Sequence, residues 1–264
     1  MFRRKRFVSA AAAVMLLCLT SCGIHVKVNG HEPDKDGRKL PAHLTAADFV
    51  IGNPYGLGEI MIAEQGTDTP YLVISDDYDG HCLLMRREVL PERFCFREGE
   101  AIYHTGAACY PDSTVDRFLH EKYETRFSEP VRSALTESNV EVLTHDAVVY
   151  GANTEHPEIE KTEYIRRKCF LLSAAEYGIN NGLHKKEGKK IPCLGDYEAA
   201  ELNWLRSAYF DDDVRAWATS RKSCGPEGTN AELYIRPVMT IDGTQAVIAA
   251  GAGYRLACDT QSET

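Results

Sequence analysis

The stretch EIMIAEQGTDTPYLVISDDYDGHCLLM, residues 59–85, decides the fold class of this chain. It contains three short apolar segments of strand length, which are Glu59 to Ala63, Tyr71 to Ser75 and Cys82 to Met85. The residues between them, Gln65 to Pro70 and Asp76 to Gly80, are rich in turn-forming side chains. Short connections favour antiparallel neighbours, so the stretch predicts a three-stranded antiparallel meander.

Asp76, Asp77 and Asp79 lie in the second of these turns. Calcium binds convergent carboxylates, which makes the three residues a weak candidate for a calcium site. The complete calcium loop also carries a distal Glu, and this stretch lacks it. An acidic hairpin turn is therefore the preferred interpretation, and no cofactor is expected.

Working outward, residues Asp112 to Ser128 carry the best helical pattern in the chain. Apolar residues recur there every three or four positions, at Val115, Phe118, Leu119, Tyr123 and Phe127. Ser113 and Asp116 have the spacing of a capping box. Glu129-Pro130 is expected to end this helix.

The second half predicts further short elements. They are a buried strand at Lys168 to Ser173, a helical turn at Ala174 to Tyr177, a solvated basic loop at His184 to Lys190, and a strand at Leu233 to Ile241 that enters the turn Asp242-Gly243. Together these elements predict an α+β domain over residues 46–264. It would have a small, mostly antiparallel mixed sheet, one main amphipathic helix and long loops.

The N-terminal residues predict export. Met1 to Arg6 is basic and Phe7 to Leu19 is an apolar run of 13 residues, shorter than the roughly 20 residues that span a bilayer. The following Leu19-Thr20-Ser21-Cys22 resembles the lipobox of bacterial lipoproteins. The resemblance implies that residues 1–21 are a signal peptide. Cys22 would carry a diacylglycerol that anchors the protein in the cell membrane, facing outside the cytoplasm.

Residues 22–45 are rich in Gly, Pro and charge, which predicts a flexible tether after the lipidated cysteine. Removal of Arg3, Arg4, Lys5 and Arg6 with the signal leaves 26 basic against 39 acidic residues, a formal net charge of −13. Such acidity disfavours nucleic acid and anionic lipid headgroups as partners.

Beyond Cys18 and Cys22 the chain has seven cysteines, which are Cys82, Cys95, Cys109, Cys169, Cys193, Cys224 and Cys258. Their number is odd, and their spacing shows neither a disulfide framework nor a CxxC pair. We interpret several of them as buried thiols. One or two disulfides are the main alternative, with no connectivity indicated.

Catalytic motifs with fixed spacing are absent from the sequence. GxSxG, HExxH, the P-loop pattern GxxxxGK[ST] and GxGxxG do not occur. No catalytic residue is assigned, and the chain is more consistent with a protein that is not an enzyme.

Two motifs in the second half are informative together. Trp204-Leu205-Arg206-Ser207 is followed by Ile235-Arg236-Pro237-Val238, after Phe170 to Ser173 with Glu176. Over about residues 57–242 this order resembles the family called domain of unknown function 6273. The resemblance implies an exported bacterial protein without an established activity. The motifs are more distantly similar to the C-type-lectin-like fold of sulfatase-modifying factors, where a tryptophan-arginine core holds a small mixed sheet.

Trp204, Arg206, Ser207 and Arg236 have two interpretations. In the preferred one they are structural, because a buried guanidinium needs carboxylates or backbone carbonyls as partners. In the other they form the rim of a site for an anionic or sugar ligand.

Three functions follow from the sequence. The leading one is a lipid-anchored extracellular binding domain of the bacterial envelope, with a glycan, peptide or protein as ligand and no catalysis. The alternatives are an envelope enzyme acting on glycans or peptides through a dispersed active site, and a structural accessory component of the envelope.

Overall fold

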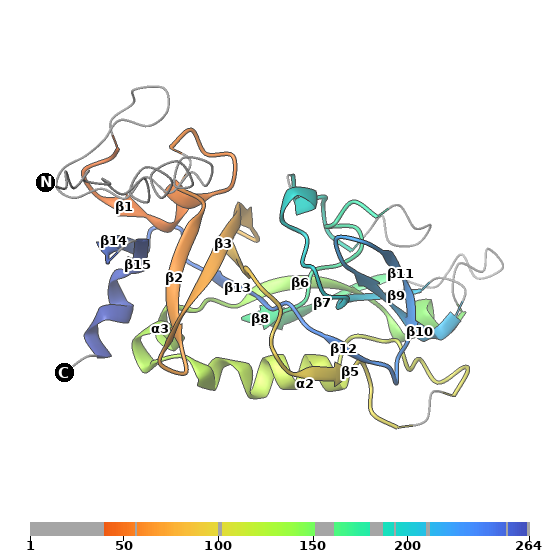
Figure 1. Ribbon diagram of the computed structural model, residues 1–264. Coiled ribbons are helices and arrows are strands. Elements are labelled where there is room, and N and C mark those ends of the chain that lie inside the picture. Colours follow the sequence, from red (N-terminus) through yellow and green to blue (C-terminus); the bar gives the residue numbers. More distant parts are fainter. Residues whose placement is uncertain are drawn as a thin grey trace, which may run out of the picture. The chain divides into compact units, whose positions relative to one another are not determined.

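The computed structural model describes residues 40–55, 57–99, 102–150, 161–179, 187–192, 194–209, 212–251 and 253–262 (Figure 1). All of them belong to one compact unit, residues 33–264. In this part of the chain three α-helices accompany three sheets that are mostly antiparallel. The predicted α+β class is therefore confirmed. Residues 1–21 and Cys22, with their predicted signal and lipid anchor, lie outside the described residues.

The largest sheet has eight strands in the order β1-β14-β15-β2-β3-β4-β13-β8. Its neighbours pair antiparallel except β15 and β2, which are parallel. In sheet order the strands are β1 (Leu44–Thr45), β14 (Ala246–Ala250), β15 (Gly253–Leu256), β2 (Glu59–Glu64), β3 (Thr67–Tyr78), β4 (His81–Arg86), β13 (Val238–Ile241) and β8 (Cys169–Phe170). β1 includes the last two residues of the predicted tether, Leu44 and Thr45.

The predicted meander is strands β2, β3 and β4, and its turns are tighter than expected. Gln65 and Gly66 join Glu64 to Thr67 with φ of 52° and 77°, and Asp79 and Gly80 join β3 to β4 with φ of 54° and 81°. Positive φ at both central residues matches the twist of paired strands. Because each turn needs two residues, β3 extends through most of the segments predicted as turns.

The second sheet has five strands in the order β11-β10-β9-β12-β5. In sheet order they are β11 (Cys224–Gly228), β10 (Asp212–Thr219), β9 (Asn203–Tyr209), β12 (Glu232–Tyr234) and β5 (Arg93–Cys95). Only β12 and β9 are parallel. The third sheet is the antiparallel pair β6 (Ser138–Leu143) and β7 (Thr162–Arg167).

The single strand predicted at Leu233 to Ile241 is two strands in two sheets. β12 ends at Tyr234 and β13 begins at Val238. Pro237 lies between them and has no N–H to donate to a strand ladder, which favours an interruption here. Ile235 to Pro237 therefore carry the chain from the five-stranded to the eight-stranded sheet.

The predicted main helix is shorter than the pattern indicated. α2 (Thr114–Glu121) is capped by Ser113, whose Oγ accepts from the Asp116 N–H at 3.1 Å. The chain then forms a 3-10 turn, η2 (Tyr123–Arg126), and begins a new helix, α3 (Glu129–Ala134). Pro130 lies in the first turn of α3, where its missing N–H costs nothing, so Glu129-Pro130 begins a helix rather than only ending one.

The remaining described helical elements are α4 (His145–Tyr150), η1 (Ala46–Phe49), η4 (Leu194–Tyr197) and η5 (Ala257–Ser262). Apolar side chains of both large sheets and of α2 join in one buried core, which includes Tyr71, Leu119, Phe170 and Trp204. No helix in the described residues is long and apolar enough to cross a membrane.

The described cysteines carry free thiols. Cys82, Cys109 and Cys169 are buried, Cys95 and Cys258 are half-buried, and Cys224 is exposed. Cys193 lies outside the described residues. Burial raises the pKa of the Cys82 thiol to about 11 and that of the Cys109 thiol to about 12, so both are neutral at physiological pH.

Candidate functional site

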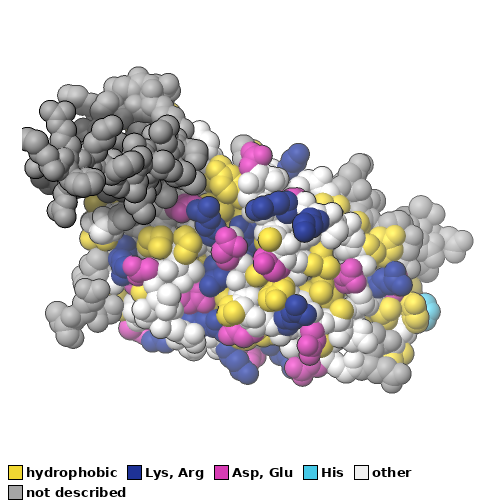
Figure 2. All heavy atoms as spheres, viewed as in Figure 1, with side chains coloured by type: hydrophobic (Ala, Val, Ile, Leu, Met, Phe, Trp, Pro, Cys, Tyr) yellow, Lys and Arg dark blue, Asp and Glu magenta, His cyan; other side chains and the backbone are white. Residues whose placement is uncertain are grey.

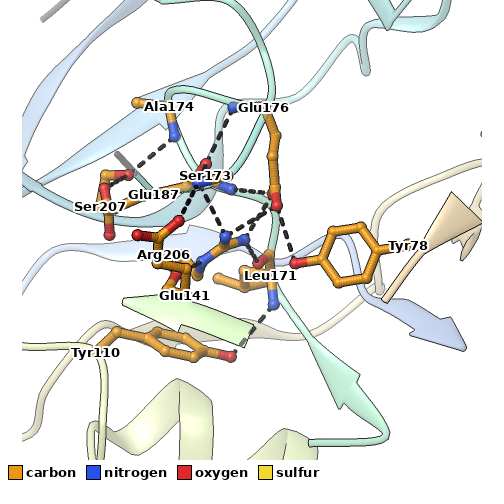
Figure 3. Close-up of polar contacts among 11 residues, drawn as sticks. Tyr78, Tyr110, Glu141, Leu171, Ser173, Ala174, Glu176, Glu187, Arg206 and Ser207 are labelled. Carbon is orange, nitrogen blue, oxygen red and sulfur yellow. Dashed lines mark hydrogen bonds and ion pairs between the residues drawn. The ribbon is translucent and has the colours of Figure 1, made fainter. Parts of the chain in front are cut away.

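Arg206 lies on β9 with a completely buried guanidinium (Figure 3). Its Nε donates to the Glu141 carbonyl at 3.0 Å. Nη1 donates to the Leu171 carbonyl at 2.8 Å and to Oε2 of Glu176 at 2.6 Å. Nη2 donates to Oε1 of Glu176 at 2.9 Å and to the Glu187 carbonyl at 3.1 Å. All five N–H donors of the guanidinium are therefore used inside the protein.

Glu176, in the turn after β8, is the counter-ion of Arg206 and is equally buried. Its carboxylate also accepts from the Ser173 N–H at 2.8 Å and from the Tyr78 hydroxyl at 2.9 Å. Burial raises the pKa of Tyr78 well above its usual value, and the charge of Glu176 raises it further. Burial alone would lower the pKa of Arg206, but Glu176 outweighs this effect and the pKa is raised. Arg206 is thus held in its charged form.

The segment Glu187 to Ile191, which we call the strap, covers this ion pair together with Ser207. The Ser207 hydroxyl donates to Oε2 of Glu187 at 2.5 Å and accepts from the Ala174 N–H at 2.9 Å. The strap is fixed by its own backbone as well, since the Gly188 N–H donates to the Glu141 carboxylate at 3.0 Å. The Ile191 N–H donates to the Glu176 carbonyl at 2.9 Å.

Gly188 shows how closely the strap covers the ion pair. Its φ is +98°, a region that suits glycine, and a Cβ at this position would lie 2.7 Å from Oε1 of Glu176. The prediction of a solvated loop at His184 to Lys190 is wrong for Glu187, which is completely buried. Lys189 and Lys190 are exposed, and residues 184–186 lie outside the described residues.

Trp204 and Arg236 connect other segments of the fold. Trp204 lies two residues before Arg206, and its indole N–H donates to the Phe94 carbonyl on β5 at 2.8 Å. Arg236 contacts backbone carbonyls, with Nε to Arg86 at 2.9 Å, Nη1 to Tyr197 at 2.6 Å and Nη2 to Arg87 at 2.5 Å. The structure therefore brings Arg206 and Ser207 into one centre and places Arg236 elsewhere, between segments that it ties together.

The three aspartates of the weak calcium candidate do not converge. Asp79, at the turn between β3 and β4, accepts through Oδ2 from the Asn139 N–H at 2.7 Å and its side-chain amide at 3.1 Å. The Asp77 N–H donates to the hydroxyl of Ser75. Within the described residues no group of three or more His, Cys, Asp or Glu side chains is placed to hold a metal ion.

A second buried carboxylate, Glu64 at the end of β2, was not found from the sequence. It accepts from the Tyr71 hydroxyl at 3.1 Å, from Nε of Arg86 at 2.9 Å and from Nη1 of Arg126 at 3.4 Å. The Tyr71 hydroxyl also contacts that of Tyr123 at 2.7 Å. The available signal was Tyr71 itself, because a tyrosine inside an apolar strand requires a hydrogen-bond partner when it is buried.

The residues around Arg206 and Arg236 fall within the part of the chain that matches a known family. Residues 79–243 match the domain of unknown function DUF6273. The chain belongs to this family. The DUF6273 match includes Glu176, Arg206 and Arg236 but begins after Glu64 and Tyr71. No curated protein and no solved structure matches the chain, so the likeness to C-type lectins stays a prediction from the sequence.

Proposed function

We propose that this DUF6273 protein is a lipid-anchored domain on the outer side of a bacterial cell membrane, where it binds another molecule without catalysing a reaction. The lipobox-like residues ending at Cys22 and the basic, apolar N-terminus support the anchor. The acidic composition of the remaining chain supports a neutral or basic ligand.

The family motif supports a structural role for its arginines. Arg206 has no N–H left for a ligand, and the Ser207 hydroxyl both donates and accepts within the protein. Arg236 is engaged by three carbonyls. A nucleophile or an anion-binding rim would need polar groups that are accessible to the substrate. The motif therefore does not provide the binding surface, which is to be sought elsewhere on the domain.

A loop with exposed apolar side chains is the observation that carries the binding proposal. Ile102 is 53% exposed and Tyr103 is 61% exposed. The base of the loop is fixed by buried Asp213, whose carboxylate accepts from the Gly106 N–H at 2.9 Å and whose carbonyl accepts from the Ala108 N–H at 2.7 Å. Apolar side chains presented on a fixed base lose little entropy when they bind a partner.

Helix α4 lies against the same loop. A Cβ at Gly106 would lie 2.7 Å from the ring of His145, at the start of α4, and Tyr150 at its end is 52% exposed. Figure 2 shows hydrophobic side chains beside a histidine at the right end of the view. Exposed aromatic side chains are enriched at binding sites. We call the two exposed tyrosines, Tyr103 and Tyr150, the aromatic edge.

Binding is tested with the full chain on an array of glycans, cell-wall fragments and peptides. We expect one saturable ligand class, weakened at least about tenfold by Tyr103→Ala or Tyr150→Ala. Ile248→Ala is the matched control, because Ile248 is also exposed but lies on β14. Equal weakening by the control variant, or no saturable ligand for a protein with a normal melting transition, contradicts binding through the aromatic edge.

The anchor is tested separately by expressing the full chain in bacteria fed a labelled fatty acid. We expect label on the native chain, which should enter the detergent phase on partitioning, and no label on Cys22→Ser. Label that persists in Cys22→Ser, or a native chain without label, contradicts lipidation at this residue.

A further inference from the structure

The outer edge of β7 has no strand beside it in the described chain. β7 pairs on one side with β6, with Ile165 opposite Val140. The described strands include no other partner for β7, whereas β6 is also contacted by Arg206 through the Glu141 carbonyl. A sheet edge with unpaired backbone groups is a template for another strand unless the protein protects it.

Side chains of β7 cover this edge only at its end, where Nη1 of Arg167 donates to the Arg166 carbonyl at 2.9 Å and Arg166 pairs with Glu137 at 2.9 Å. Tyr164 is 67% exposed, the most exposed of the large hydrophobic residues described, and the Arg166 side chain is 70% exposed. No proline or bulge interrupts β7, and its pairing with β6 is regular over six residues. Charged groups of both signs lie along the strand, with Glu163 near its start and Arg166 and Arg167 at its end.

We propose that β7 pairs antiparallel with β7 of a second copy of this chain, about a two-fold axis at Ile165. The axis places Tyr164 opposite Arg166 of the partner subunit, and Glu163 opposite Arg167 of the partner subunit. Symmetry repeats both pairs. A guanidinium against a tyrosine ring and a carboxylate against a guanidinium are both favourable cross-strand pairs.

The alternative antiparallel register, centred on Tyr164, is less favourable. It would place the Glu163 carboxylate opposite Ile165 of the partner subunit, which leaves the charge without a partner. The Ile165 register instead pairs the opposite charges along β7. Arg167 retains its bidentate contact with Asp116, at 2.9 and 2.8 Å, and gains a second carboxylate.

The proposal is tested by sedimentation velocity of the full chain in excess detergent micelles over a range of protein concentrations. We expect a concentration-dependent dimer. Tyr164→Arg and Arg166→Tyr should each raise the dimer dissociation constant at least about tenfold, because each removes the tyrosine–arginine pairs. The double variant Tyr164→Arg/Arg166→Tyr recreates these pairs in reverse order and should restore dimerisation to within about threefold of the native chain.

Tyr103→Arg is the matched control, since Tyr103 is similarly exposed but lies in the loop before Gly106. It should leave the dimer unchanged. The melting temperature of each variant is measured to check that it remains folded. A monomer at every concentration, weakening by Tyr103→Arg equal to that of Tyr164→Arg, or a double variant that fails to restore the dimer overturns the proposal.

Glu163→Arg tests the register. In the Ile165 register it opposes Arg167 of the partner subunit with a second positive charge and weakens the dimer at least about tenfold. In the Tyr164 register it only replaces one charge opposite an isoleucine with another. A dimer that tolerates Glu163→Arg therefore overturns the Ile165 register.

Discussion

Two buried carboxylates in this protein have similar partners but different surroundings. Glu176 accepts from Tyr78 and Arg206, and Glu64 accepts from Tyr71 and Arg86. Both tyrosines lie on β3. The Glu176 and Arg206 side chains are completely buried, whereas Arg86 and Arg126 beside Glu64 keep 14% and 12% of their side chains exposed. We call Glu176 with its partners the sealed centre, and Glu64 with its partners the open centre.

The two centres also differ in how far along the chain they reach. In the open centre Arg86 also donates to the nearby carbonyls of Glu88 and Val89. One distant segment, η2, joins this centre through Arg126 and Tyr123. Arg206 joins β9 to β6, to the segment after β8 and to the strap. The sealed centre therefore joins β9 to three separate segments through one side chain, whereas the open centre is joined by one distant segment. The comparison indicates that its loss should affect the whole fold, while loss of the open centre should affect stability less.

The largest effect is expected from Arg206→Ala. The substitution leaves the Glu176 carboxylate buried without its counter-ion, which costs about 3 to 5 kcal/mol of unfolding free energy. Urea denaturation monitored by far-UV circular dichroism measures this loss. A loss below about 1 kcal/mol would show that the sealed centre is not the main connection between β9, β6 and the strap.

A smaller loss is expected from Gly188→Ala in the strap. The positive φ and the contact with Oε1 of Glu176 both oppose a Cβ, for a cost of about 2 to 3 kcal/mol. Gly66→Ala is the matched control, because Gly66 has a φ of +77° and no atom within 4 Å of the added Cβ. Equal losses for the two variants would mean that the strap can move away from Glu176 without cost.

Glu64→Gln should cost less, about 1 to 2 kcal/mol, since the amide oxygen still accepts a hydrogen bond and water reaches the edge of the open centre. The same denaturation experiment measures it beside Glu176→Gln. We expect Glu176→Gln to be the more destabilising of the two. The reverse order would contradict the distinction between the centres.

The pH dependence of stability tests Tyr78. Burial and Glu176 raise its pKa well above the usual value near 10, so above pH 10 the unfolded chain loses a proton that the folded chain retains. Stability is therefore fully present below about pH 10 and falls above it, by about 1.4 kcal/mol per pH unit for this residue. Tyr78→Phe should reduce the loss of unfolding free energy per pH unit by this amount, as measured by denaturation between pH 9 and 11. An unchanged slope would show that Tyr78 ionises freely in the folded protein.

The sequence predicted the parts of the fold that local patterns determine. The β2 to β4 meander follows from apolar segments between turn residues, and the start of α2 follows from the Ser113 cap. The end of α2 could not be predicted in this way. Tyr123 in the 3-10 turn and Phe127 after that turn continue the apolar spacing of the helix. The split at Pro237 was missed because each half is apolar enough to be a strand.

The candidate site was predicted only in part. A buried guanidinium must have partners, and this reasoning directed attention to Arg206 and Arg236, whose guanidinium groups are hydrogen-bonded within the protein. Glu187 was missed because it lies among lysines, and a run of charges gives no sign that one carboxylate points inward. Its burial depends on Ser207 and Arg206, which are far from it in sequence. No local pattern could have indicated that contact.

A double-mutant cycle tests whether Arg206 and Glu176 act as one structural unit. Unfolding free energies are measured for the native chain, Arg206→Met, Glu176→Met and the double variant. We expect the double variant to be more stable than the sum of the single losses implies, with a coupling of at least about 2 kcal/mol. Additive losses within about 0.5 kcal/mol would contradict it, because they would show that neither residue depends on the other.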